Sequence, residues 1–339
     1  AISAAVGNGF AGGLAGGGAN SFNTITGNSQ ALITSANVGT NRGFWNGNLE
    51  VINSDSTTID ATVDSIAAGG AVGQNAGSVA IGVGYARNFI GEMQGNPREG
   101  GGNPIGFINV LGGFGNLVRA AVTDSNLFTL GTTSIKAINS TSITSNVTSC
   151  AAALSLSASS GGSLVGAGSE ATNRSLLDLQ AFLGGTNNKT ITIDTGALMV
   201  TGTDLSSLDA ISVGASMSSS FSGAGAVAAS IGVSTANNTL NNSVSTKLQN
   251  IATGSKAKAL TVSSNRTKAS GRDTSMRAKS VAAAASSAIG AGAVGLAGGG
   301  GEANNILLGD TTTTLTATNL SITGDIKLDS NNSQNAYAG

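Results

Sequence analysis

Residues 49–54 read LEVINS, and four later stretches share its alternation of apolar and polar side chains. They are IKAINS at 135–140, LMVTGT at 198–203, LTVSSN at 260–265 and IKLDSN at 326–331. Alternation with a period of two points one set of side chains inward and the other into solvent, as in a β-strand. The return of one strand at long intervals predicts a tandem-repeat protein.

Each copy continues in the same order: a polar run, a run rich in Gly, Ala and Val, a corner that contains Asn, and a short β-branched strand. Four copies have the corners GYARNFI, STANNTL, GEANNIL and GANSFNTI, and the third has the looser GSEATNRSLL. Successive copies start 86, 63, 62 and 66 residues apart. We therefore expect an all-β fold, a parallel β-helix (β-solenoid) built from tandem repeats of about 62 residues.

The repeats predict one continuous array over residues 1–339, with starts near 49, 135, 198, 260 and 326. Joining Gly339 to Ala1 gives a further spacing of 62 residues, so residues 1–48 complete the copy that begins at 326. Neither end carries a recognisable cap. We expect either a slice of a longer array or subunits that stack head to tail, an open contact that generates fibres.

The size of one rung follows from the usual range for such repeats. A rung of roughly 20 residues gives about three rungs per copy, and ~4.8 Å per stacked strand gives a chain roughly 75 to 80 Å long. Gly and Asn at the corners supply positive φ angles, and stacked Asn side chains can form amide ladders. Pro97 and Pro104 both lie outside the repeated pattern, as a strand array requires.

Composition limits the classes of function. The chain has 51 Gly, 10% charged and 4% aromatic residues and a net charge of -1, which suits a narrow core and gives no general attraction to nucleic acid or anionic membranes. It has no His, the commonest general base and a common metal ligand. The uncharged segment 281–301 is mostly Ala, Gly and Ser, so we interpret it as a solenoid wall and expect no membrane span.

Carboxylates were considered for catalysis and for metal binding. Asp204 with Asp209, and Asp325 with Asp329, are loosely spaced and lack the rhythm of calcium-binding loops. Few charges stand near them to build a glycosidase groove. We expect no enzymatic activity, no catalytic residues, no cofactor and no metal site.

Two segments break the pattern, and each carries two aromatic side chains. One is the inserted loop at 94–117, and the other is the loop at 42–48, which holds the only Trp. Loops that protrude from a solenoid are frequent binding sites. The candidate contact residues, for a neighbouring fibril or a surface carbohydrate, are Phe44, Trp45, Phe107 and Phe114. The alternative is that these loops pack back on the solenoid wall.

Charge is also uneven along the chain. A basic cluster comprises Lys256, Lys258, Arg266, Lys268, Arg272, Arg277 and Lys279, and the matching region of the second copy holds Asp55, Asp60 and Asp64. Opposite charges at equivalent repeat positions can set the register between fibres that bundle laterally. A solvated charged face is the alternative.

The modules SIAAGGAVGQNAGSVAIGVGYARNFI at 65–90 and SSAIGAGAVGLAGGGGEANNILLGDTTTTLTATNL at 286–320 carry a resemblance. They resemble the repeat regions of giant bacterial cell-surface proteins, namely filamentous adhesins and autotransporter-like passengers. The resemblance implies a right-handed parallel β-helix, secretion, an extracellular or cell-surface location, and a role in adhesion or a surface coat. It supplies no catalytic residues.

The expected function is thus a structural or adhesive extracellular fibre segment that stacks end to end or belongs to a giant surface repeat protein. One alternative is a carbohydrate-processing β-helix, tailspike-like or lyase-like. Another is an ice-binding or surface-binding solenoid, suggested by the Thr run at 311–314.

Overall fold

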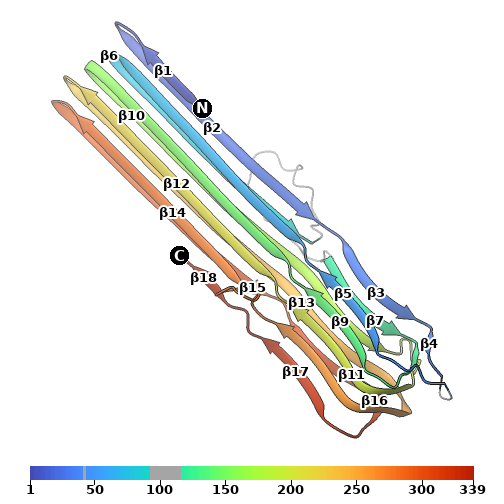
Figure 1. Ribbon diagram of the computed structural model, residues 1–339. Coiled ribbons are helices and arrows are strands. Elements are labelled where there is room, and N and C mark those ends of the chain that lie inside the picture. Colours follow the sequence, from blue (N-terminus) through green and yellow to red (C-terminus); the bar gives the residue numbers. More distant parts are fainter. Residues whose placement is uncertain (41–42, 92–115) are drawn as a thin grey trace.

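The computed structural model describes residues 1–40, 43–91 and 116–339, and every regular element in this part of the chain is a β-strand (Figure 1). The named strands form one sheet of long parallel strands, an all-β architecture compatible with a β-solenoid. The strands are β1 Ile2–Val6, β2 Phe10–Ile25, β3 Asn28–Thr34, β4 Asn37–Val38, β5 Leu49–Asp55, β6 Thr58–Ile90, β7 Asn116–Thr123, β8 Asn126–Phe128, β9 Thr133–Asn139, β10 Ser142–Gly184, β11 Ile193–Asp204, β12 Ser207–Ser222, β13 Gly225–Arg266, β14 Met276–Ile289, β15 Gly292–Leu308, β16 Thr311–Ile322, β17 Ile326–Asn332 and β18 Ala336–Ala338.

Neighbouring strands join residues that are far apart in the sequence. Ser142 of β10, for example, lies between Thr58 of β6 and Ser207 of β12. The expected rung of roughly 20 residues is therefore wrong. One layer of the stack takes a whole copy, because the chain stays extended through the Gly/Ala runs instead of bending there. β2, β6, β10, β13 and β15 lie side by side as five layers, so the stack is only ~24 Å deep at ~4.8 Å per layer.

The five signature stretches lie next to one another as β5, β9, β11, the last part of β13, and β17. Leu198, Leu260 and Ile326 share one position of this row. The second copy is offset by two residues, since Thr133 and not Ile135 occupies that position. The same alternation that identified the strands therefore holds them in register with the same face inward.

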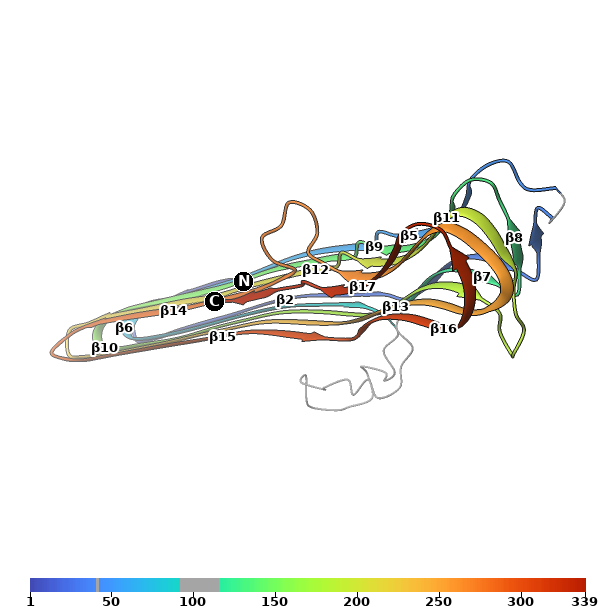
Figure 2. The same cartoon turned by 90° about the horizontal axis from the view of Figure 1, so that it is seen from below.

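The molecule has two parts (Figure 2). In the flat part, called the arm, two sheet walls face one another. In each layer of the stack the chain runs outward in one wall, turns at a tip, and returns in the facing wall. In the second layer of the stack, β6 makes both passes, with the tip at residues 73–75. The wider part, called the head, contains the remaining strands and the signature row. Arm and head differ in what fills them.

Small side chains fill the arm. Ala80 and Ala86 are fully buried, and inward glycines lie against the backbone of the facing wall. A Cβ added to Gly214 would lie 2.3 Å from the carbonyl oxygen of Val233. Buried serines bridge the two walls, as Ser163 Oγ and Ser218 Oγ do at 2.6 Å. The two walls therefore approach more closely than the ~10 Å of ordinary stacked sheets.

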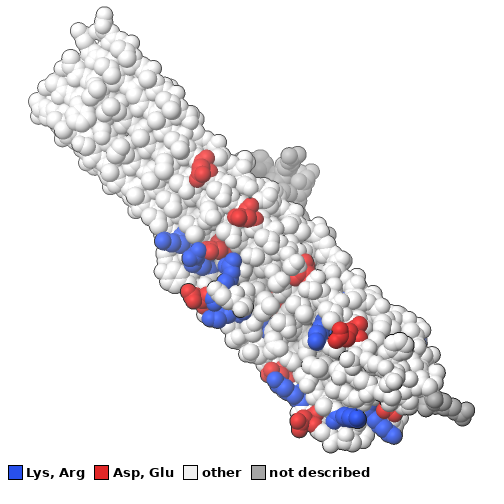
Figure 3. Space-filling view, in the orientation of Figure 1, with Lys and Arg blue, Asp and Glu red and all other residues white. Residues whose placement is uncertain are grey.

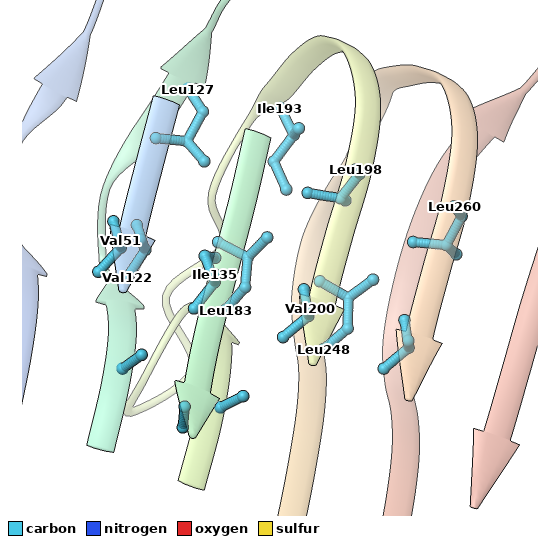
Figure 4. Close-up of a cluster of buried hydrophobic side chains, with 14 of the residues drawn as sticks. Val51, Val122, Leu127, Ile135, Leu183, Ile193, Leu198, Val200, Leu248 and Leu260 are labelled. Atoms are coloured by element: carbon cyan, nitrogen blue, oxygen red, sulfur yellow. The ribbon is translucent and has the colours of Figure 1, made fainter. Parts of the chain in front are cut away.

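Large aliphatic side chains fill the head, where strands from successive layers meet around one core (Figure 4). The chain bends there at positions that share one place in four layers and adopt positive φ, namely Ser35, Asp124, Asn250 and Ala317. The core side chains shown in Figure 4 include Val51, Val122, Leu127, Ile135, Leu183, Ile193, Leu198, Val200, Leu248 and Leu260.

Candidate functional site

Among the described residues, the stack has two edges whose outer sides are unpaired. On the first edge, the described residues pair β1 and β2 only with β6, and β3 only with β7. On the last edge, they pair β15, β16 and β17 only with β13. Each edge strand therefore presents unpaired backbone N–H and C=O groups along its outer side, which is a template for another strand.

These edges carry few of the devices that usually block pairing. β2 has 16 residues and no charged side chain, and β15 has 17 residues and only Glu302. Neither strand contains Pro. Natural edge strands are normally short, charged, bulged or covered, so these two are unusually ready to pair.

A ladder of asparagines crosses the stack from one edge to the other. Each Nδ2 donates to the Oδ1 of the next layer, at 2.8, 3.1, 3.1 and 3.0 Å. Its three central members are buried. The sequence suggested that these asparagines form corners, but the ladder lies inside strands. Inward amides can satisfy one another there. Its members in order are Asn23, Asn88, Asn173, Asn238 and Asn305.

The ladder has a direction, because every amide donates toward the last edge. At the last edge, Asn305 accepts from Asn238, and its Nδ2 donates at 2.5 Å to the carbonyl oxygen of Tyr337, which leaves one N–H of the amide over. At the first edge, Asn23 donates to Asn88 and to Ser21, and among the described residues no donor reaches its Oδ1. One edge thus offers a donor and the other an acceptor.

Four residues of the proposed charge register lie on one outer face of the arm. Asp60 and Asp64 are exposed in the second layer, and Arg277 and Lys279 are exposed in the fifth. Arg277 donates two hydrogen bonds to Asp209, the shorter at 2.6 Å, and these bonds raise the pKa of the guanidinium. The acidic residues of the register thus lie toward one end of the stack and its basic residues toward the other, where Asp209 pairs with Arg277.

The other residues of that register are scattered. Lys256, Lys258 and Lys268 are exposed, whereas Asp55 and Arg272 are half-buried. Arg272 reaches toward the arm charges, because its guanidinium donates at 3.4 Å to the hydroxyl of Ser142, two residues before the position of Asp60 in the row. Among the described residues, Lys and Arg gather with Asp and Glu in one half of the face seen in Figure 3.

Arg266 is buried and is not a surface charge. Its side chain and that of Asp204 have no exposed area, with 3.9 Å between Nε and Oδ2. Its two terminal nitrogens donate to the carbonyl oxygens of Gly309 and Leu308. Burial lowers the pKa of the guanidinium, while Asp204 and Asp310 act in the opposite direction. Arg266 therefore holds the stack together internally and contributes nothing to a register between fibres.

Asp204 is the centre of a buried polar cluster. Its Oδ1 accepts from Asn139 at 2.7 Å and from Ser206, and its Oδ2 accepts from Asn242 at 3.1 Å. The carboxylate is thus fully occupied inside the protein. A substrate would have no access to it.

The aromatic loop is partly packed against the head. The ring of Phe44 meets Phe128 edge to face at 6.0 Å between centroids. Trp45 forms an isolated backbone bridge with Thr129, directly after β8, yet 56% of the residue is exposed. Phe107 and Phe114 lie outside the described residues. The packed-back alternative thus holds for Phe44, and Trp45 remains a contact candidate.

Within the described residues, no group of three or more Cys, Asp and Glu side chains is placed to hold a metal ion. The same part of the chain has no helix long and apolar enough to cross a membrane. A shallow apolar groove on an outer face of the arm is lined by Ile66, Cys150, Ala215, Met217 and Ala284 among others.

The comparisons with known proteins give no relative. No protein-family model, no curated protein and no solved structure matches this chain. The features that bear on function are therefore the open edges, the asparagine ladder and the arm surface.

Proposed function

We propose that this chain is a structural or adhesive segment of an extracellular fibre, in which the last edge of one copy pairs with the first edge of the next. In this proposal each layer is one coil of a β-solenoid, with a repeat near the ~62 residues expected from the sequence. The extracellular location is supported by the resemblance of the repeat modules to giant surface adhesins. No catalytic role is assigned.

The observation that carries the proposal is the pair of long edges whose outer sides no described residue pairs with. Unpaired backbone groups on both edges can be satisfied by strands of the same kind, which continues the parallel ladder without a new type of contact. Such a contact joins different surfaces of identical copies and does not close, so it propagates.

The ladder gives this contact a direction. Asn305 on the last edge has an N–H to donate, and Asn23 on the first edge has an acceptor oxygen. A copy added at the last edge would extend the ladder with the donor-to-acceptor order of the other layers. Two first edges, or two last edges, would set like groups against one another.

Charge supports the same direction. Arg277 lies in the same position of the row as Asp60, three layers away along the stack. Stacking of copies would bring the basic end of one arm toward the acidic end of the next, ~10 Å apart across two layers. Complementary fields of this kind favour the correct partner and the correct order.

The test is the variant Asn305→Asp. Its carboxylate still accepts from Asn238 and loses within the chain only the bond to the carbonyl oxygen of Tyr337 in the short exposed strand β18, so the chain should fold. The donor toward the next copy, however, becomes an acceptor and a charge. Negative-stain microscopy should show filaments for the wild type and short or no filaments for Asn305→Asp. Asn331→Asp is the control, because it makes the same charge change at an exposed position of the same edge. Equal filament lengths for both variants would refute the proposed contact.

The adhesive part of the proposal rests on Trp45. Its exposed indole can stack on a sugar ring or on a neighbouring fibril. Trp45→Ala should reduce attachment to glycan-coated surfaces or lateral bundling without a change in filament length. Unchanged attachment and unchanged bundling would remove this residue from the proposal.

A further inference from the structure

The outer half of the arm has no charged side chain in any layer. Residues 65–84, 149–169, 214–234 and 282–301 contain no Asp, Glu, Lys or Arg, and neither do the side chains of residues 1–19. These five segments, called the distal arm, form the charge-free half of the molecule in Figure 3. Its outward side chains are apolar or small, while Ala, Ser and Gly point inward.

One face of the distal arm, made by β2, β6, β10, β13 and β15, has a regular relief. Ile81 of β6 lies next to Gly166 of β10, which lies next to Ile231 of β13, which lies next to Gly298 of β15. Ile81 and Ile231 are 50% and 56% exposed. Two residues further along, the same alternation repeats in the row Val83, Gly168, Val233 and Gly300. In these two rows the face has aliphatic ridges on β6 and β13 and grooves on β10 and β15. In the row before them the order is reversed: Leu164 of β10 and Leu296 of β15 are 50% and 62% exposed, and Ala229 of β13 lies between them.

The groove glycines are not required by this chain itself. A Cβ added to Gly166, Gly168, Gly298 or Gly300 would meet nothing within 4 Å, and none of the four has positive φ. A glycine inside a strand weakens it and often marks a place where another backbone approaches closely. The relief thus points to a surface that lies on this face.

The size of the face suits one protein partner. Five layers at ~4.8 Å and about ten residues at ~3.3 Å give a face of ~24 by ~33 Å. That is ~800 Å² per partner, the area of a standard protein interface. Because large and small residues alternate from layer to layer in each of these rows, an identical face shifted by one layer can set its large residues against the small ones. No charge opposes such a contact.

We propose that a second copy of this chain packs face to face on the distal arm, with the ridges of each copy in the grooves of the other. The contact is a dry zipper of interdigitated side chains between two sheets. It rests on the proposed function only in the choice of partner, since it needs no pairing at the edges. It adds a contact on one defined face of the arm to the candidate contact at Trp45 in the head.

The test fills the groove. In the double variant Gly166→Val/Gly168→Val, the added side chains point into open space, and Val favours the strand conformation, so the fold should be kept or stabilised. Gly70→Val is the control on the opposite outer face of the arm, where the nearest atom to the new Cβ, the carbonyl oxygen of Ser3, is 3.9 Å away. Circular dichroism and thermal unfolding establish that all three proteins are folded.

The readout is mass by light scattering for discrete particles, or mass per unit length by scanning transmission microscopy for filaments. Wild type and Gly70→Val should have twice the value of the double variant. Asn305→Asp should shorten filaments without halving this value, which separates this contact from the axial one. Equal values for the double variant and wild type would overturn the inference. So would wild type that stays single in solution and floats with phosphatidylcholine vesicles, since lipid would then cover the face.

Discussion

The side-chain amide of Asn88 donates to the Oδ1 of Asn173 at 3.1 Å, although the two residues are 85 positions apart and both are fully buried. Each layer contributes one such amide, so the ladder fixes the register of the stack from within. A shift of one residue between layers would bury an unpaired amide and turn every inward side chain outward.

Asn173→Ala should destabilise the protein by about 1 to 3 kcal/mol, because Asn238 then loses the donor to its Oδ1 inside the core. The midpoint of urea unfolding measures this. Asn237→Ala, one position earlier and on the outer side, should change stability by less than ~0.5 kcal/mol. Similar losses for both variants would show that the ladder does not stabilise the stack.

Two glycines give a matched pair of opposite expectation. Gly214→Ala places a Cβ 2.3 Å from the carbonyl oxygen of Val233, so the two facing walls of the arm must move apart at a cost of about 1 to 3 kcal/mol. Gly166→Ala meets nothing within 4 Å and should stabilise the strand by about 0.5 to 1 kcal/mol. Thermal unfolding of the two variants decides. If Gly214→Ala leaves the stability unchanged, the two walls of the arm do not approach as closely as described.

The buried pair of Arg266 and Asp204 should be sensitive to loss of one partner. Arg266→Met leaves a carboxylate without its counter-charge and should cost about 3 to 5 kcal/mol. Asp204→Asn added to Arg266→Met removes that charge and should recover part of the loss. Denaturant unfolding of the single and double variants measures the coupling. If the double variant is no more stable than Arg266→Met, the pair is not coupled.

Acid should weaken the head through Asp124. Its carboxylate accepts from the Thr186 backbone N–H at 2.7 Å and from the Thr186 hydroxyl at 2.9 Å, and these bonds hold its pKa below the ordinary 3.8. Because the folded pKa is depressed, the stabilisation is present above the unfolded pKa and is lost as pH falls through the folded one. The melting temperature should therefore fall below about pH 4, and less steeply in Asp124→Asn. The same slope in both proteins would contradict this role.

Much of the strand architecture follows from the sequence, but the path of the chain does not. Alternation around Val51 and Val200 identified strands that do pair in one row. The layer length was wrong because the usual range for such repeats was applied, whereas Gly82 and Gly214 sit within long straight strands whose facing walls need small residues. The prediction that Asn forms corners was wrong for a related reason. The inward amides of Asn88 and Asn173 are satisfied only by the neighbouring layers of the stack.

The candidate site was less accessible. Asp204 and Arg266 occupy the same position of the signature row, so alignment of the copies residue by residue would have revealed that pair. The distal arm required knowledge of which side of each strand faces inward. In β6 the larger residues Ile81 and Val83 face outward while Ala80 is buried, the reverse of the usual hydrophobic pattern.

The most direct test of axial stacking is electron cryo-microscopy of the concentrated wild-type protein. The proposed contact between edges predicts filaments with a layer spacing of ~4.8 Å and one chain every five layers, ~24 Å along the axis. Single particles at all concentrations, or filaments whose chains join through a surface other than the two edges, would contradict it.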